Sequence, residues 1–247
     1  SKFIPISEAR ANKFKIDWEK TRITEPSFIG NKVFKNYSLS EIAKHIDWTP
    51  FFHSWEMKGT YPKILNDSAH GTEAKKLFDD GQKMLKKVIA EKWLQANAVI
   101  GFYPAKAEGD DIVLTDKKSK IVFHTIRQQT KKSDGQSNVA LSDFISPFWG
   151  DREREGADYI GAFAVTTGIG IEKKLAEFEK DHDDYSSIML KALADRLAEA
   201  FAEHLHARVR KEFWGYAKDE NLSSEDIIAE KYQGIRPAPG YPAQPDH

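Results

Sequence analysis

The hydrophobic period changes along this chain, and the order of those changes limits its fold more than any other feature. Apolar residues recur mostly at helical spacing from Thr72 to Ala96. From Ala98 to Ile126 they form short β-branched and aromatic runs separated by polar turns, a pattern typical of antiparallel strands. A second helical pattern, from Ser186 to Lys211, is the longest in the sequence. The order helix, strand meander and helix predicts an α+β fold.

Several element boundaries follow from the same pattern. We expect strands at 99–103, 112–114, 121–123 and 159–165, with turns at 108–110 and 117–119. The capping-box spacing at Ser38 predicts a short helix that ends near Ile46 or Asp47, with an ordered loop over 47–52, and Ser223 begins another capped helix. The long helix carries a single apolar stripe formed by Leu190, Leu193, Leu197, Phe201, Leu205 and Val209.

Composition excludes several classes of protein. A chain of 247 residues with no visible interdomain linker favours one domain over residues 1–247. The formal net charge of -1 gives no overall field that would attract nucleic acid or an anionic membrane. The lack of cysteine removes disulfides and thiolate chemistry, and no apolar run reaches the roughly 20 residues that a membrane span needs. We therefore expect a cytoplasmic protein with neither nucleic acid nor membrane as a partner.

Two short motifs have ordinary explanations. Gly168-Ile169-Gly170 lies where a dinucleotide-binding turn would lie, but Lys173 replaces the third glycine, so an ordinary strand-to-helix turn is favoured. Two Glu-x-x-His pairs, Glu179 with His182 and Glu203 with His206, resemble the ligands of di-iron bundles. Pairs of this kind arise readily by chance, and a strand meander contradicts a four-helix bundle. We therefore expect both histidines to lie on the surface, and no metal ligand is predicted.

Two other features are open to a functional explanation. Asp195, Glu199 and Glu203 follow one another at i, i+4 spacing opposite the apolar stripe. They form either a solvated face or an acidic surface that binds a cation. The segment from Arg236 to Pro245 contains four prolines, which stiffen the backbone and leave its carbonyl groups exposed. It is suited to line a ligand site, or alternatively to act as a proline-rich peptide ligand for an SH3-type groove.

One stretch carries a specific family resemblance. Residues 232–243, Tyr-Gln-Gly-Ile-Arg-Pro-Ala-Pro-Gly-Tyr-Pro-Ala, closely resemble the signature of the activation domain of cobalamin-dependent methionine synthase. Further stretches resemble the same family in the same order, and together they span essentially the whole chain: 46–52, 128–130, 157–166, 182–185, 191–203 and 245–247. The resemblance implies a curved single α+β domain with a twisted antiparallel sheet flanked by helices.

The resemblance also implies a function. Such a domain binds S-adenosylmethionine and supplies its methyl group when cobalamin, oxidised to inactive cob(II)alamin, is reductively remethylated. The implied partners are a cobalamin-binding domain, which is separate because this sequence contains no Asp-x-His-x-x-Gly motif, and a flavodoxin-type electron donor. As part of a methyltransferase, this chain alone is expected to bind S-adenosylmethionine without turnover. No catalytic side chain is needed, since the sulfonium is already activated and cobalt is the attacking centre.

Matching the family motifs places five residues at the ligand. Asp47 is expected on the ammonium group, Arg236 on the carboxylate and Glu199 near the positive methionine end, with Ala238 and Tyr241 along the adenosine. Domains of this family continue beyond the position of His247, so the sequence is expected to lack a C-terminal extension and to bind the ligand more weakly.

Overall fold

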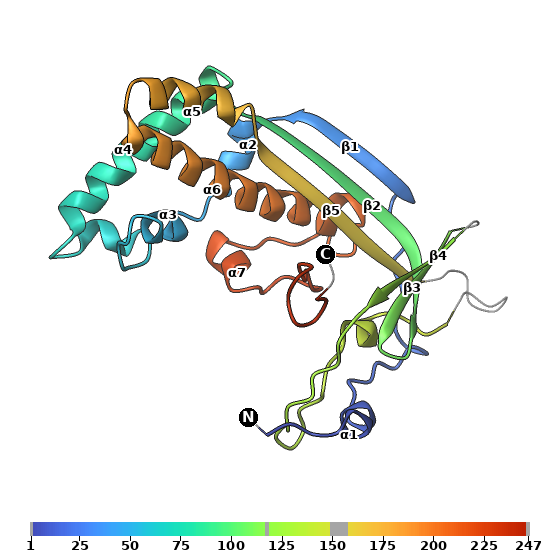
Figure 1. Ribbon diagram of the computed structural model, residues 1–247. Helices are drawn as coiled ribbons and strands as arrows, with labels where there is room; N and C mark the ends of the chain where they lie inside the picture. The colour runs from blue at the N-terminus through green and yellow to red at the C-terminus, as the bar shows by residue number, and fades with distance from the viewer. Residues whose placement is uncertain (1, 117–118, 149–157, 246–247) are drawn as a thin grey trace. The chain divides into compact units, whose positions relative to one another are not determined.

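The computed structural model describes residues 2–116, 119–148 and 158–245. The chain divides into two compact units (Figure 1). Unit 1 consists of Ser1–Asn31, Gly101–Ala162 and Arg210–His247, and unit 2 consists of Lys32–Ile100 and Phe163–Val209. Residues 117–118 of the turn expected at 117–119 lie outside the described part of the chain, as do Ala157, Asp246 and His247 of the matched stretches.

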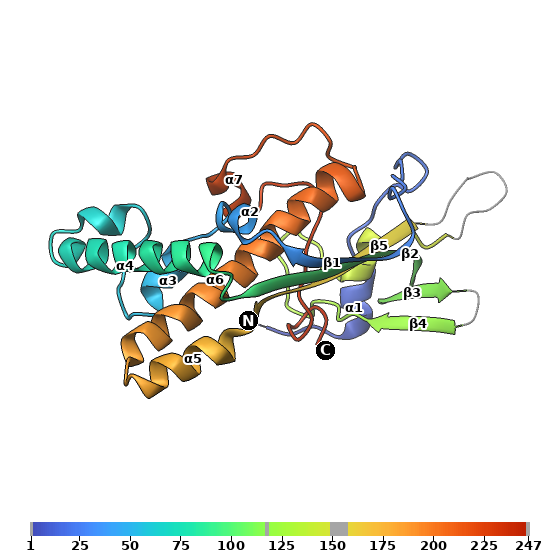
Figure 2. The same cartoon turned by 90° about the horizontal axis from the view of Figure 1, so that it is seen from above.

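The helices of unit 2 pack around α6 (Asp184–Arg208). It contacts α2 (Leu39–Ala43), α3 (Thr49–His53), α4 (Gly71–Ala90) and α5 (Ile171–Lys180). Figure 2 shows α4 and α5 on opposite sides of α6. All six residues of the predicted apolar stripe are buried, from Leu190 to Val209. Because a stripe at helical spacing covers one side of the helix, its burial leaves the opposite face of α6 for polar side chains.

The strands form a five-stranded sheet with the order β1-β2-β3-β4 and with β5 paired to β2. Its strands are β1 (Gly30–Tyr37), β2 (Gln95–Glu108), β3 (Asp111–Asp116), β4 (Ser119–His124) and β5 (Asp158–Ile169). The predicted meander is confirmed: β2 pairs antiparallel with β3 and β3 with β4, in a register that places Ile112 opposite Phe123. The expected α+β class, with an antiparallel sheet flanked by helices, is confirmed.

The remaining elements are short. They are α1 (Ile6–Ala11), η1 (Lys63–Asn66), η2 (Leu141–Phe144), the π-helical turn η3 (Val209–Phe213) and α7 (Ser224–Ile228). The cap predicted at Ser223 is present, since its hydroxyl accepts a hydrogen bond from the Asp226 N–H at 3.1 Å.

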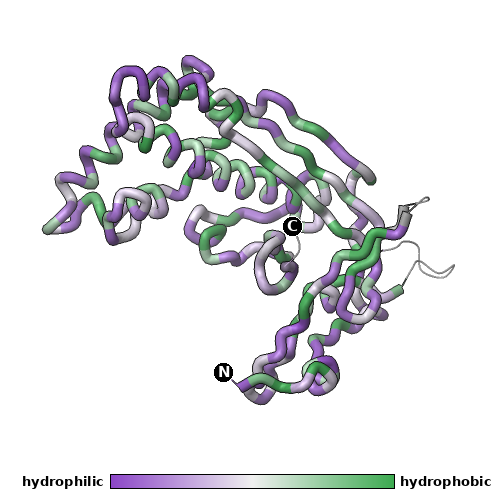
Figure 3. The backbone as a smooth tube through the Cα atoms, viewed as in Figure 1, coloured by the Kyte–Doolittle hydropathy of each residue, from purple (hydrophilic) through white to green (hydrophobic). Residues whose placement is uncertain are grey.

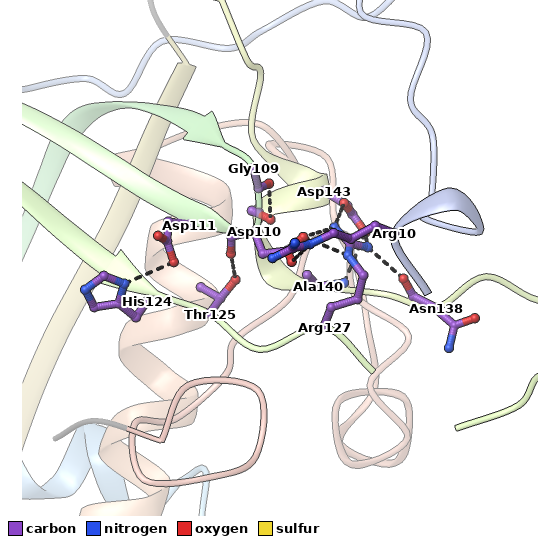
Figure 4. Close-up of polar contacts among 11 residues, drawn as sticks. Arg10, Gly109, Asp110, Asp111, His124, Thr125, Arg127, Asn138, Ala140 and Asp143 are labelled. Atoms are coloured by element: carbon purple, nitrogen blue, oxygen red, sulfur yellow. Dashed lines mark hydrogen bonds and ion pairs between the residues drawn. The ribbon is translucent and has the colours of Figure 1, made fainter. Parts of the chain in front are cut away.

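Buried Arg127 joins separate segments of unit 1 (Figure 4). Its guanidinium donates to both carboxylate oxygens of Asp143, to Asp110 Oδ1 and to the Asn138 carbonyl, each at 2.7 Å. Arg10 donates to the second oxygen of Asp110 at 2.8 Å. The bidentate contact with Asp143 is the main reason that the pKa of Arg127 is raised. One side chain therefore links the N-terminal helix region, the β2–β3 turn and the loop before η2.

Several boundaries differ from those predicted. The ordered loop expected over 47–52 ends at Trp48, because α3 starts at Thr49. Pro50 fits the first turn of α3, because N–H groups there have no partner within the helix. Helix α4 ends at Ala90 instead of 96, since Lys92 takes a left-handed conformation (φ 54°) that no helix continues. Among the elements of eight or more residues, β1 and α5 were not predicted; β1 is mostly exposed and α5 buries no residue fully. Hydrophilic residues dominate α5 in Figure 3.

Among the helices of the described residues, none combines the length and the apolar character that a membrane span requires.

Candidate functional site

Asp47 lies in the short turn that connects α2 to α3 in unit 2. Asp47 holds the end of this turn, since its Oδ1 accepts the Thr49 N–H at 2.9 Å. The neighbouring Trp48 is buried, which anchors the turn, while Asp47 is half-buried. No described residue bonds to the second carboxylate oxygen. Asp47 can thus offer that oxygen to an ammonium group.

Glu199 lies on the polar face of α6, one turn from both Asp195 and Glu203. Its side chain is exposed, and within the described part of the chain its carboxylate forms neither a hydrogen bond nor an ion pair. Asp195, by contrast, pairs with Arg196 at 2.6 Å. The buried stripe of α6 fixes this face, and Glu199 is a carboxylate available to a positively charged ligand.

The C-terminal segment carries the other three predicted residues, in unit 1. Its described residues after α7, up to Pro245, form no helix and no strand ladder. Two bonds close a loop near the end of this range: Gly240 N–H to the Gln244 carbonyl and Gln244 N–H to the Tyr241 carbonyl, both at 2.9 Å. The Ile126 N–H donates to the Ala243 carbonyl at 3.0 Å and ties this loop to the residues after β4. Tyr241 is 67% exposed and Ala238 is also exposed, so both can contact a ligand.

The five predicted residues divide between the two units. Asp47 and Glu199 belong to unit 2, whereas Arg236, Ala238 and Tyr241 share one segment of unit 1. The contacts given above for each residue are those within its own unit. That all five contact one ligand stays a prediction from the matched motifs.

A hydrogen-bonded chain of four side chains lies two residues from Asp47 and was not predicted. Arg208 donates to the Tyr37 hydroxyl at 2.9 Å, this hydroxyl lies 2.7 Å from His204 Nε2, and His204 Nδ1 lies 3.0 Å from His45 Nε2. Burial, with repulsion from His45 and Arg208, lowers the pKa of His204 to about 4. Burial also lowers the pKa of His45. With both rings neutral, the Tyr37 hydroxyl donates to His204, and His204 donates in turn to His45.

Two cavities in unit 2 do not contain the predicted residues. One, of about 520 Å³, is lined by Trp55, Met57, Leu77, Asp80 and Tyr185 among others, and a neighbouring one of about 400 Å³ shares Asp80 and Tyr185. Neither includes Asp47 or Glu199.

The glycine motif takes the ordinary form, whereas the expectation of surface histidines holds for exposed His182 and is wrong for His206, which is buried in α6. Gly170 is the left-handed N-cap of α5 (φ 93°), which makes Gly168-Ile169-Gly170 the end of β5 and the turn into a helix. Within residues 2–116, 119–148 and 158–245, no three metal-ligating side chains gather in one place, and the Glu-x-x-His pairs form no such group.

Comparison with known proteins identifies the family. Residues 38–247 match the family model described as the activation domain of vitamin B12-dependent methionine synthase. The chain is also similar to a solved structure, the crystal structure of the MetH reactivation domain bound to AdoHcy, with 48% sequence identity and a TM-score of 0.89 over 99% of this chain and 75% of that one. The five-stranded antiparallel sheet flanked by helices matches the fold of that reactivation domain. The chain belongs to the activation-domain family of vitamin B12-dependent methionine synthase.

The family match bears on the alternative for the proline-rich segment. It extends through Arg236 to Pro245, so this segment belongs to the domain. A free peptide ligand for an SH3-type groove is not favoured.

Proposed function

We propose that this chain binds S-adenosylmethionine and presents its methyl group to cobalamin held by a separate domain, thereby reactivating the methionine synthase. The observation that carries the proposal is the match of residues 38–247 to the activation-domain family. The related structure, 48% identical, is described as bound to AdoHcy, which is S-adenosylmethionine without its transferable methyl group.

The chemistry asks little of protein side chains beyond binding. The bond between the methyl carbon and the sulfonium sulfur breaks, its electron pair stays on sulfur to give AdoHcy, and the methyl group passes to reduced cobalt. One electron, from a flavodoxin-type donor, is needed to reduce cob(II)alamin beforehand. Since the sulfonium is an activated leaving group, the task of the domain is to orient the ligand and exclude competing water.

Three of the five predicted residues, Asp47, Glu199 and Arg236, would supply the charges that this ligand needs. Asp47, with an available carboxylate oxygen, would bind the ammonium group, and Arg236 would bind the carboxylate in bidentate fashion. Glu199 would lie near the positive methionine end, while Ala238 and Tyr241 would contact the adenosine through backbone and ring. We also propose that residues 1–247 act as one activation domain in the cytoplasm.

Calorimetric titration of the purified chain with AdoHcy and with S-adenosylmethionine tests the proposal. We expect saturable binding with one site. Arg236→Ala should weaken it by about 10- to 100-fold, the usual loss when a charge-assisted bond is removed, and Arg236→Lys should restore only part of the affinity because an ammonium group has no bidentate fork.

The matched control is Arg22→Ala, which removes an exposed arginine of the same unit. Its affinity should equal that of the wild type. Equal affinities of the wild type, Arg236→Ala and Arg236→Lys would show that Arg236 does not bind the ligand.

A further inference from the structure

Arg210 is an arginine with no exposure to solvent, placed in the π-helical turn that follows α6. Its Nε and Nη2 groups donate to the two carboxylate oxygens of Glu220, both at 2.7 Å. The Glu220 side chain is only 9% exposed. A bidentate contact of this kind fixes the plane of the guanidinium group as well as its position.

Stability alone is a poor explanation for this ion pair. Removing two charges from water costs nearly as much as their attraction returns, so a buried pair often contributes little to the free energy of unfolding. What it does provide is a rigid, oriented flat surface. The Arg210 guanidinium carbon lies 4.5 Å from the centre of the Tyr232 ring, within the range of a cation–π contact.

Tyr232 begins the segment that leads to Arg236, and a second contact follows two residues later. Gly234 has a left-handed φ of 92°, and a Cβ atom there would lie 2.9 Å from the Tyr216 hydroxyl. Tyr216 packs edge-on against Trp214, whose indole N–H donates to the Thr24 carbonyl at 2.8 Å. Burial raises the pKa of Tyr216 to about 12, so this hydroxyl stays uncharged at neutral pH.

The segment needs such supports because regular structure does not hold it. Residues 232–238 lie in neither helix nor strand. Arg236 precedes Pro237, which confines the Arg236 backbone to extended conformations. The contact of the Tyr232 ring with Arg210, the contact of Gly234 with Tyr216 and the restricted backbone of Arg236 act together. They leave few conformations for the three residues between Tyr232 and Arg236.

We propose that Tyr232 is a positioning residue for Arg236: the buried Arg210–Glu220 pair holds the Tyr232 ring, and the ring fixes the segment that presents the Arg236 guanidinium to the ligand carboxylate. The inference rests on the proposed function for the ligand, whereas the immobilisation of residues 233–236 is independent of it. All the residues of this support lie in unit 1.

The test compares Tyr232→Leu with Tyr232→Phe. Leucine removes the ring that Arg210 contacts, whereas phenylalanine keeps it. Tyr232→Leu should weaken AdoHcy binding by about 5-fold, the scale of one cation–π contact, and Tyr232→Phe should bind within 2-fold of the wild type. Recovery by Phe identifies the ring, not the hydroxyl or general packing, as the cause.

Two measurements separate positioning from loss of stability and from failure of the proposed function. Ile112→Val, in the apolar cluster of Ala105, Ile112 and Leu114, lowers stability elsewhere in unit 1 and should leave AdoHcy binding unchanged. In addition, ¹⁵N relaxation of the unliganded protein should give order parameters for residues 233–236 near ~0.85 in the wild type and Tyr232→Phe, and below ~0.6 in Tyr232→Leu.

If the wild type binds no AdoHcy, the proposed function fails, and the relaxation data still decide whether Tyr232 immobilises the segment. If order parameters and affinity are the same in Tyr232→Leu as in the wild type, the positioning role is overturned.

Discussion

At the scale of single residues, the two neighbouring histidines show how burial sets charge. His45 and His204 are half-buried and face each other, with Glu41, Lys44, Glu203, Tyr37 and Arg208 around them. A proton on either ring would remove an acceptor from the chain that runs from Arg208 to His45. Burial is the largest cause of the lowered pKa of both rings, and the pKa of His204 falls to about 4. At neutral pH both rings are therefore uncharged in the folded protein.

This has a measurable consequence for stability against pH. In the unfolded chain a histidine has a pKa of about 6.5, whereas the pKa of His204 in the folded protein is about 4. Between these two pH values the unfolded state therefore binds a proton that folded His204 does not bind. The free energy of unfolding should fall as the pH drops from 6.5 toward 4. Urea titrations at pH 7.5 and pH 5 should show a smaller fall for His204→Gln than for the wild type.

His182→Asn provides the comparison, because His182 is exposed and left-handed (φ 52°), a conformation that asparagine tolerates. This variant should follow the wild type at both pH values. An identical fall in His204→Gln would show that other groups cause the pH dependence.

At the scale of elements, burial decided what could be predicted. The stripe of α6 and the β2–β4 meander repeat apolar residues at the spacing of their own geometry, and both were found. β1 was missed because most of its residues are exposed and show no alternation, and α5 because it buries none fully. The predicted end of α4 was too late, because Trp93 and Leu94 continue the apolar pattern in the sequence. The helix itself ends at Ala90, since Lys92 takes a left-handed conformation.

Helix α4 also contains a glycine whose substitution should have the opposite of the usual effect. Replacing glycine by alanine inside a helix normally stabilises by about 1 kcal/mol. At Gly81, however, the new Cβ would lie 2.9 Å from Cζ of Phe51, a ring with no exposure that has little room to move. Gly81→Ala should lower the free energy of unfolding by about 1–3 kcal/mol.

Asp79→Ala, on the exposed side of the same helix, introduces an alanine without the clash and should be neutral or slightly stabilising. Chemical denaturation of both variants makes the comparison. A stabilised Gly81→Ala protein would mean that Phe51 moves aside without cost.

At the scale of the whole molecule, the candidate site could not be derived from spacing. Its residues are spread from position 47 to position 241, and nothing in local periodicity connects a turn carboxylate with an arginine in a proline-rich segment. Only the matched motifs connect them. The Arg210–Glu220 pair and the contact between His45 and His204 were missed for a related reason. They form only on folding, and single residues of these types show no periodic pattern in the sequence.

A chain that binds S-adenosylmethionine but carries no cobalamin should not consume it. Incubation with S-adenosylmethionine and a reductant should leave AdoHcy at background, whereas addition of a cobalamin-bearing domain from a related methionine synthase should release one AdoHcy per cobalamin. Chromatographic measurement of AdoHcy distinguishes these outcomes, and Arg236→Ala with the same additions is the control. Release of AdoHcy without cobalamin would reveal another methyl acceptor.

The division of the chain limits how it can be cut. The polypeptide passes between the units four times, after Asn31, Ile100, Ala162 and Val209, and both termini belong to unit 1. No contiguous fragment contains all of one unit and none of the other. Any contiguous fragment that contains both Asp47 and Glu199 also carries residues 101–162, so gene fusion or limited proteolysis cannot transfer unit 2 to another protein without part of unit 1.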